Sequence, residues 1–574
     1  MTVVEAALGP PGPAAAGRRA RLWKHLALLA LALAILVPFS RPSVPTADEG
    51  TYGLQADALR DGQWAIHYRF ADLDPTGRWF PLANSSASAS GREHYPYLKH
   101  PLFSVVQAQL GKTFGRDVGY LLPSLAGVLG TAAAAWVLAR RLRPGSEQIA
   151  FWLAGAGPVL FSGFVIWAHA PATALAGLAT IGALRLRDDA SLRRRTADQA
   201  AIVVGLAGCL LLRSEGLLFG LALLAATGVD RLWPGDRRPS PSGLARSLPS
   251  AAARVAPGLI ALLAARLGER AWIVAVGGAA PRDLVVRSLA GEPSWLAGRR
   301  SGIWTSTFAG SIFSDRAALL PGLILIGAVV IASRHRLRRP GSVPAALAAV
   351  ALAIAVQQAA SDVDRITGIL SAWPLVAIGV VALGSRPGAR WRVPLVAVVV
   401  YVLAVWATQY ADGGGFQWGG RLLQVAVVPL AVAGAAGLSV LVEERSGEAR
   451  RAVVAAMALL VLVGSTASFV SLRALRGETA TALDAIAVET GPVAVATNLE
   501  LPRLMWRYDI DWLHADRKDL PTVLGELRSS TDLRQVSVVS GQRVDPSDVA
   551  PFGRITAERE AGTSGVVVYD VTRR

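Results

Sequence analysis

Long apolar runs recur along the whole chain. Many of these Ala-, Leu- and Val-rich segments could cross a hydrocarbon core of about 30 Å, which takes around 20 helical residues. The 574 residues are 52% hydrophobic and only 17% charged, and the mean hydropathy is +0.41. Soluble domains carry about 25% charged residues. The sequence therefore predicts an α-helical polytopic membrane protein.

The apolar runs predict about thirteen transmembrane helices within residues 21–472. The stretch GRRARLWKH is basic and precedes the first run, from about Leu26 to Pro38. Because no small-residue cleavage site follows, we interpret this run as an uncleaved first helix and residues 1–20 as a cytoplasmic tail. The other expected spans lie near residues 118–140, 150–168, 170–186, 198–213, 216–230, 253–276, 317–333, 344–360, 368–383, 392–410, 421–440 and 451–472.

The charges of the connecting loops predict the orientation. Every second loop is Arg-rich: ARRLRPG, RLRDDASLRRR, DRLWPGDRR, SRHRLRRPG, SRPGARWR and EERSGEARR. Positively charged loops remain in the cytoplasm, so the net charge of +17 indicates topology and not a nucleic-acid partner. Residues 41–116 then form the first extracytoplasmic loop. Its segment 101–115 is apolar but short, and counting it as a span would invert every later loop, so we expect an interfacial or juxtamembrane helix there.

The last hundred residues differ in character. GPVAVATN, RQVSVVSG and GVVVYDV indicate short buried strands, and DLPTVLGELRSS between the first two indicates a helix. We expect residues 473–574 to form a small soluble α/β domain on the extracytoplasmic side. The single cysteine, Cys209, excludes an internal disulfide and a cysteine-based metal site.

Polar residues that are not plain basic stretches gather on the predicted outer face. Ionisable groups near the hydrocarbon are costly, and they are usually paired or functional. The topology places the following near that face: Asp48, Glu49, His169, Arg213, Glu215, Asp362, Asp364, Arg365, Gln417, Trp418 and Arg421.

These residue types suit transfer of a sugar from a lipid phosphate. A carboxylate can act as a general base toward an attacking hydroxyl. Arginines can bind a phosphate bidentately and stabilise it as it leaves. Trp and Tyr rings can stack on the C–H edges of a sugar.

The same residues resemble a known family. The Asp-Glu pair, HYPYLKHPL, LRSEG and GGFQWGGR are similar to motifs of the GT-C fold glycosyltransferases that use polyprenyl-phosphate sugars. The resemblance is to the protein mannosyltransferase and aminoarabinose transferase (family 39-like) branch, over roughly residues 20–440. It implies about thirteen spans, an outer C-terminal α/β domain and a catalytic acidic residue in the first outer loop. That role falls to Asp48, with Glu49 assisting, and Lys99 to Leu102 would lie near the lipid phosphate.

Two departures from the family bear on the acceptor. A single proline follows His100, where protein mannosyltransferases typically have two, and no large domain is inserted between the later helices. Both departures weaken the prediction of a protein acceptor. Actinobacterial arabinosyl- and mannosyltransferases of the cell envelope are equally compatible with the sequence.

The sequence therefore predicts an inverting glycosyltransferase of the cell membrane, with its active site on the extracytoplasmic side. The expected partners are a polyprenyl-phosphate-linked sugar donor, a glycan, lipid or protein acceptor, and the bilayer, without nucleic acid. The sequence indicates no definite cofactor, and no complete metal-ligand set is visible; a divalent cation (Mg²⁺ or Mn²⁺) on Asp362 and Asp364 with a carboxylate of the first loop stays open. The remaining expected roles are donor-phosphate binding by Lys99, His100, Arg213 and Arg421, and substrate binding by Tyr52, Tyr97, His169, Glu215, Gln417 and Trp418.

Other interpretations compete with these roles. Arg213 and Glu215 can simply pair across a turn, His169 can be a packed turn residue, and Trp418 with Arg421 can anchor the chain at the interface. For the whole chain, a transporter or flippase of lipid-linked sugars and an envelope-assembly scaffold are the alternatives. A transporter needs polar groups near the midplane, and the predicted spans hold few charged residues there.

Overall fold

The computed structural model describes most of the chain. The described residues are 13–40, 46–82, 86–87, 92–96, 100–187, 192–233, 240–277, 302–304, 306–307, 343, 345–347, 349–352, 368–383, 388–408, 418–498, 500–562 and 565–574. They form two compact units. Unit 1 comprises the described residues of 1–39, 123–268 and 286–471, and unit 2 those of 40–122, 269–285 and 472–574.

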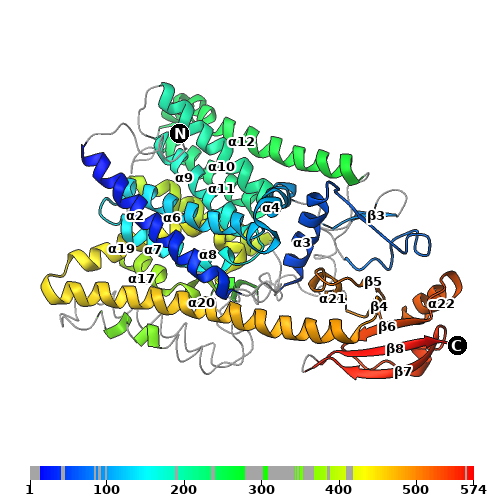
Figure 1. Ribbon diagram of the computed structural model, residues 1–574. Helices are drawn as coiled ribbons and strands as arrows, with labels where there is room; N and C mark the ends of the chain where they lie inside the picture. Colours follow the sequence, from blue (N-terminus) through cyan, green and yellow to red (C-terminus); the bar gives the residue numbers. More distant parts are fainter. Residues whose placement is uncertain are drawn as a thin grey trace. The chain divides into compact units, whose positions relative to one another are not determined.

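Unit 1 consists of helices, and α9, α10 and α11 pack side by side in it (Figure 1). Six helices among the described residues are long and apolar enough to cross a membrane, which makes the chain a multi-pass membrane protein. The helices that lie in unit 1 or reach it are α2 (Pro13–Leu36), α6 (Leu122–Leu142), α7 (Glu147–Gly155), α8 (Pro158–Gly163), α9 (His169–Arg185), α10 (Leu192–Leu212), α11 (Glu215–Leu232), α12 (Pro241–Gly277), α16 (Ile369–Ala372), α17 (Pro374–Leu383), α18 (Arg392–Thr408), α19 (Val427–Glu443) and α20 (Gly447–Glu489), with the 3₁₀ turns η1 (Val37–Phe39), η3 (Ala389–Trp391) and η4 (Arg421–Ala426).

Most expected spans coincide with helices, and three differ in detail. The run 150–168 is divided into α7 and α8 at Pro158, and the run 368–383 is divided into α16 and α17 at Pro374. Proline lacks an N–H and clashes with the preceding turn, which explains both breaks. The run 421–440 begins as the 3₁₀ turn η4. The expected span 317–333 and most of 344–360 lie outside the described residues, so the count of thirteen stays a prediction.

Helices α17 and α19 approach each other through glycines. A Cβ on Gly437 would lie 1.8 Å from the carbonyl oxygen of Gly379, and one on Gly379 would lie 2.1 Å from that of Gly434. Small residues let helix backbones pack closely, and such contacts hold membrane helices together where the hydrophobic effect is weak. The three glycines therefore fix the spacing of this pair.

The sheet of unit 2 has five strands in the order β5-β4-β6-β8-β7 (Figure 1, orange to red). The strands are β4 (Val493–Ala496), β5 (Asp511–His514), β6 (Gln535–Ser540), β7 (Gly553–Glu560) and β8 (Val567–Arg573). β5, β4 and β6 are parallel, and β6, β8 and β7 are antiparallel. The three strands expected from the sequence, β4, β6 and β8, are confirmed, and so is the helix expected between the first two, α22 (Leu520–Ser530). β5 and β7 are additional. Two short helices, α21 (Leu501–Leu504) and α23 (Pro546–Val549), connect the strands.

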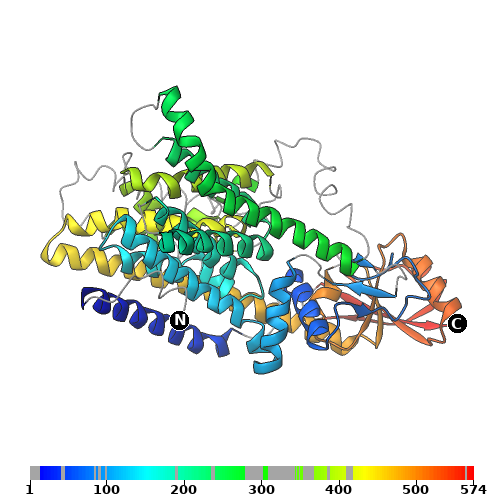
Figure 2. The ribbon, with the colours of Figure 1, turned by 90° about the horizontal axis from the view of Figure 1, so that it is seen from above.

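Part of the expected first loop packs against this sheet (Figure 2). Tyr68, Phe70, Trp79 and Phe80 are buried in the same core as β4, β5, β6 and α22, and the amide of His514 donates to the carbonyl of Trp79 at 2.8 Å. The loop adds a small sheet, ordered β1-β3-β2, made of β1 (Ile66–His67), β2 (Ser86–Ala87) and β3 (Glu93–Tyr95). The loop and the C-terminal residues therefore share one hydrophobic core.

A buried aspartate organises the loop beneath that core. The carboxylate of Asp74 accepts from the amide of Trp79 at 2.7 Å, from the amide of Arg78 at 2.9 Å and from the hydroxyl of Tyr68 at 3.1 Å. Burial, and then the charge of Asp74, raise the pKa of Tyr68 well above its ordinary value, so the phenol stays protonated and donates. This network closes the turn that directs Trp79 and Phe80 into the core.

Three further helices belong to unit 2: α3 (Ala47–Arg60), α4 (Pro101–Phe114) and α5 (Arg116–Gly119). α3 and α4 pack against each other, and α4 coincides with the short helix expected at 101–115. α20 continues for 43 residues, from Gly447 to Glu489, past the expected end of the last span at 472. The domain boundary expected at 473 therefore falls inside a continuous helix, and the boundaries themselves stay a prediction.

Candidate functional site

The pair Asp48-Glu49 lies in the first turn of a helix and not in an irregular loop. The hydroxyl of Thr46 accepts from the amide of Glu49 at 3.4 Å and so caps α3. Two carboxylates in the first turn also suit the positive end of the helix dipole. The local sequence TADEGTYG therefore begins a helix, and this start holds the backbone of Asp48 in a fixed conformation.

The two neighbouring carboxylates have different surroundings. Asp48 is half-buried, whereas Glu49 is fully buried. Glu49 Oε1 lies 3.4 Å from Arg476 Nη2, and the side chains of this ion pair are 0% and 3% exposed. Arg476 Nη1 also donates to the carbonyl of Ser40 at 3.0 Å. Of the two carboxylates, Asp48 is the one that is partly accessible.

The segment before α4 is held in an unusual conformation. His100 has φ of 54°, in the left-handed region that costs a non-glycine residue free energy. Its Nδ1 lies 3.1 Å from Glu269 Oε1, and its amide donates to the same oxygen at 3.0 Å. Both side chains are at most 5% exposed. Glu269, which the sequence reasoning missed, therefore fixes His100.

Tyr52 is a packing residue of α3 in the structure. It is 2% exposed, and its ring makes an edge contact with Phe103 of α4, with ring centroids 5.3 Å apart. Its expected role in substrate binding stays a prediction. The expected site residues Tyr97, Lys99 and Gln417 lie outside the described residues, and so do Asp362, Asp364 and Arg365.

Four of the expected site residues come together in unit 1. Arg213 and Glu215 form a two-pronged pair: Nε to Oε2 is 3.1 Å and Nη2 to Oε1 is 2.6 Å. Arg421 Nε donates to His169 Nε2 at 3.2 Å, and Arg421 also interacts electrostatically with Glu215. These residues come from the start of α9, the turn between α10 and α11, and the start of η4. We call these four residues the arginine cluster.

The arginine cluster is positively charged and lined by an aromatic ring. The guanidinium of Arg421 lies over the ring of Trp167, 4.8 Å from its centroid. The negative charge of Glu215 offsets one of the two arginines. With His169 neutral, the four residues of the cluster therefore carry a net charge of about +1. Two guanidinium groups beside an imidazole are donors of the kind that bind phosphate.

Gln424 is a buried polar residue that the sequence reasoning missed. It is 1% exposed, and its Oε1 accepts from the hydroxyl of Ser162 at 2.7 Å, while its carbonyl accepts from Thr173 Oγ1 at 3.1 Å. Its Nε2 donates to the carbonyl of Trp418 at 3.4 Å. Gln424 therefore fastens η4, and with it Arg421, to α8 and α9. An amide within the apolar run LLQVAVV was the available signal.

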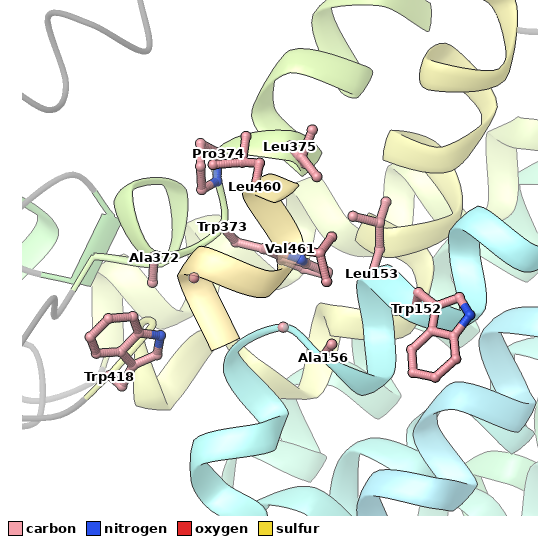
Figure 3. Close-up of a pocket in the computed structure, with 12 residues that line it drawn as sticks. Trp152, Leu153, Ala156, Ala372, Trp373, Pro374, Leu375, Trp418, Leu460 and Val461 are labelled. Carbon is pink, nitrogen blue, oxygen red and sulfur yellow. The ribbon is translucent and has the colours of Figure 1, made fainter. Parts of the chain in front are cut away.

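Trp418 lines a small apolar pocket, with Trp152 and Trp373 (Figure 3). The other lining residues are aliphatic side chains, glycines and Pro374, from α7 and the turn after it, α16, α17 and α20. Trp418 is 2% exposed. Trp418 thus lies among aliphatic and aromatic side chains. Its expected contact with substrate stays a prediction.

No group of three or more His, Cys, Asp or Glu side chains suitable for a metal ion is found within the part of the chain that the structure describes. The two aspartates considered for a divalent cation lie outside that part. A cation on these aspartates therefore stays a prediction.

Comparison with solved structures shows that the chain has the GT-C fold, with a membrane-spanning helical part and a small C-terminal sheet domain. It is similar to ArnT from Cupriavidus metallidurans, an aminoarabinose transferase, in the apo state, with a TM-score of 0.53 and 13% identity over 95% of this chain and 97% of that one. The structure of ArnT from Cupriavidus metallidurans bound to undecaprenyl phosphate gives a TM-score of 0.53 and 14% identity, over the same 95% and 97%.

A more distant likeness is to the oligosaccharyltransferase AglB from Archaeoglobus fulgidus in complex with an inhibitory peptide and a dolichol-phosphate. Its TM-score is 0.46, with 11% identity over 91% of this chain and 69% of that one. No family model and no curated protein sequence matches the chain. The identities of 13% and 14% to ArnT establish the fold, and the activity must be argued from the residues.

Proposed function

We propose that the protein is an inverting membrane glycosyltransferase. It moves a sugar from a polyprenyl-phosphate donor to a hydroxyl of an envelope glycan, lipid or protein. The observation that carries the proposal is the arginine cluster, because it joins two guanidinium groups, an imidazole and an aromatic ring from distant parts of a GT-C fold. A lipid-linked donor is supported by the ArnT structure with undecaprenyl phosphate.

In the proposed reaction, Asp48 is the general base. Its carboxylate accepts the proton of the acceptor hydroxyl while the hydroxyl oxygen attacks the anomeric carbon of the sugar. The bond from that carbon to the phosphate oxygen breaks, and the oxygen keeps the bonding electron pair. Attack opposite the leaving group inverts the anomeric centre. The partial accessibility of Asp48, next to a fully buried Glu49, supports this assignment.

Arg421 and Arg213 stabilise the departing lipid phosphate. Charge grows on the phosphate oxygens as the bond breaks, so fixed cationic donors favour the transition state. Glu215 holds Arg213 through two hydrogen bonds, and His169 with Trp167 orients Arg421. Lys99 and His100 are the further phosphate-binding residues of the proposal.

The active site and the C-terminal sheet belong on the extracytoplasmic side in this proposal. The alternation of Arg-rich loops along the chain supports that orientation. A lipid-phosphate donor suits it, since the tail lies in the bilayer and the phosphate at the interface.

A transfer assay tests the proposed function. The purified full-length chain in lipid vesicles is given a panel of radiolabelled polyprenyl-phosphate sugars and an envelope extract as acceptor. The proposal expects label from at least one donor to enter acceptor material with release of the polyprenyl phosphate. Movement of intact labelled lipid across the vesicle membrane without release would indicate a flippase instead and contradict the proposal. Neither transfer nor movement with any donor would contradict it as well.

A further inference from the structure

Arg476 of α20 is a buried arginine that contacts both Ser40, which precedes α3, and Glu49 in the first turn of α3. Arg476 Nη1 donates to the carbonyl of Ser40, which directly follows η1, and Nη2 lies 3.4 Å from Glu49 Oε1. The side chains of Arg476 and Glu49 are 3% and 0% exposed, so this ion pair lies in the interior of unit 2. One guanidinium thus joins Ser40 to the first turn of α3.

A second contact fixes α3 from the C-terminal residues. A Cβ on Gly50 would lie 1.9 Å from the carbonyl oxygen of Arg503, and one on Gly53 would lie 2.5 Å from the ring of Trp506. The two glycines are three residues apart, so they lie on one face of the helix. That face rests directly on the segment around α21, without room for any side chain.

The two contacts restrain α3 in complementary ways. The glycine face lets the helix lie close against residues 503–506, and the Glu49–Arg476 pair ties its first turn to α20. Asp48 directly precedes Glu49 in the same turn. A displacement of that turn would move the carboxylate of Asp48 with it.

We propose that Arg476 is a positioning residue for Asp48 and acts through Glu49. The C-terminal part of the chain then holds α3, the helix that carries Asp48, in place. This inference rests on the proposed function, in which Asp48 is the general base. Glu49 then serves as the anchor of α3 and makes no contact with substrate. Buried pairs are often worth little to stability but fix a unique arrangement, which is the role assigned to this one.

Replacement of Arg476 tests the inference in the full-length chain. Arg476→Gln is expected to lower kcat about 10- to 100-fold, because a misplacement near 1 Å can cost two orders of magnitude. The KM for the lipid donor is expected to change less than twofold. Arg476→Lys, whose ammonium can still pair with Glu49, is expected to recover part of the lost kcat. The matched control is Arg473→Gln, an exposed arginine three residues earlier on α20, and it is expected to leave kcat unchanged.

A folding defect is distinguished by a second variant. If Arg476→Gln does not yield a monodisperse protein, the double variant Glu49→Gln/Arg476→Gln removes both charges of the buried ion pair. We expect that variant to fold and to keep the low kcat. Wild-type kcat in either folded variant would overturn the inference.

Hydrogen exchange tests the positioning without any activity. Arg476→Gln is expected to speed amide exchange in residues 47–60, whereas Arg473→Gln is not. If the wild type transfers no sugar, the proposed function fails, yet the exchange measurement still reports on α3. If the wild type and Arg476→Gln transfer equally while exchange rises, the positioning role fails and the proposed function stands. Unchanged exchange in Arg476→Gln would overturn the structural step itself.

Discussion

Asp48 and Glu49 are adjacent in the sequence, but their side chains meet different surroundings. The half-buried carboxylate of Asp48 lies in the capped first turn of α3, and that of Glu49 is enclosed with the guanidinium of Arg476. A general base must exchange protons with a substrate, which requires access. The sequence alone does not distinguish the two carboxylates, but their burial favours Asp48 as the base.

Replacement of Arg421 should weaken donor binding. Its guanidinium contacts His169 and stacks over Trp167, a geometry that an ammonium cannot reproduce. A charged hydrogen bond to phosphate is worth about 1.5–3 kcal/mol, so Arg421→Ala should raise the KM for the lipid donor about 10- to 100-fold. The KM of Arg421→Lys should lie between those of the wild type and of Arg421→Ala. Donor titrations measure this, with Arg450→Ala on the exposed surface as control. Stabilisation of the departing phosphate should in addition lower kcat, so wild-type values of both KM and kcat in Arg421→Ala would refute the phosphate role.

Removal of Arg213 should destabilise the protein more than removal of the pair. Arg213→Met leaves Glu215 buried without its two-pronged partner, which costs about 3–5 kcal/mol. Arg213→Met/Glu215→Leu leaves no such charge and should lose much less. Thermal unfolding in detergent compares the two variants with the wild type. Equal losses in both variants would show that the pair does not act as a unit.

At the level of the elements, hydropathy predicted where helices run better than where they break or end. The prolines at 158 and 374 divide two of the expected spans, although the apolar pattern continues through them. α20 extends beyond its apolar run because SLRALRGETATALDAIAVE, though polar, contains no proline to end the helix. Hydropathy detects apolar spans, so it does not predict a polar extension of the same helix.

The glycine contact of α17 with α19 gives a prediction about an element pair. A methyl group on Gly437 would meet the backbone of Gly379, so Gly437→Ala should force the helices apart. Overpacking of this kind costs about 1–3 kcal/mol. The melting temperature in detergent should fall, whereas Gly464→Ala on α20, whose added Cβ would meet no other segment within 4 Å, should not lower it. Equal melting temperatures for the two variants would contradict the close packing.

The candidate site was predictable in part. Loop charges and short turns predicted His169, Arg213, Glu215 and Arg421 on one face. In the structure they form two hydrogen-bonded pairs, and Arg421 interacts electrostatically with Glu215. Glu269, Gln424 and Arg476 were missed because their partners are distant in the sequence; Arg476 and Glu49 are 427 residues apart. Gln424 stands alone in an apolar run, which is the signal that could have found it. Glu269 lies between Arg266 and Arg270, so its sequence neighbours did not single it out.

At the scale of the whole molecule, the C-terminal sheet depends on residues from the first loop. The loop supplies core side chains and the hydrogen bond from His514 to Trp79. The C-terminal residues form one core cluster by themselves, but the core over β4, β5 and β6 is completed by aromatic side chains of the loop. This is why the pattern of 473–574 predicted an α/β domain correctly but could not predict what covers it.

The stability of the contact between β5 and the first loop is expected to depend on the protonation of His514. Burial lowers the pKa of His514, and Asp516 and Asp519 oppose that shift only partly. A histidine with a folded pKa below its unfolded value near 6.5 takes up its proton first in the unfolded chain, so stability falls as the pH drops below about 6.5 and is unaffected above it. β5 amides should exchange faster at pH 5.5 than at 7.5, after correction for intrinsic rates.

The matched variants separate this effect from general acid sensitivity. His514→Gln should reduce the difference between the two pH values, because glutamine does not titrate. The exposed His67→Gln should leave the difference as in the wild type. The same pH difference in His514→Gln and in the wild type would assign the acid sensitivity to other groups.

The central claim is that Asp48 is the base of a lipid-sugar transferase. The most direct test is the transfer rate of Asp48→Asn in vesicles, measured with binding of the lipid donor to the same preparation. Loss of a general base typically costs about 10²- to 10⁴-fold in rate, so transfer should fall by at least about 10²-fold while donor binding and folding stay at wild-type levels. Full transfer activity in folded Asp48→Asn protein would contradict the account.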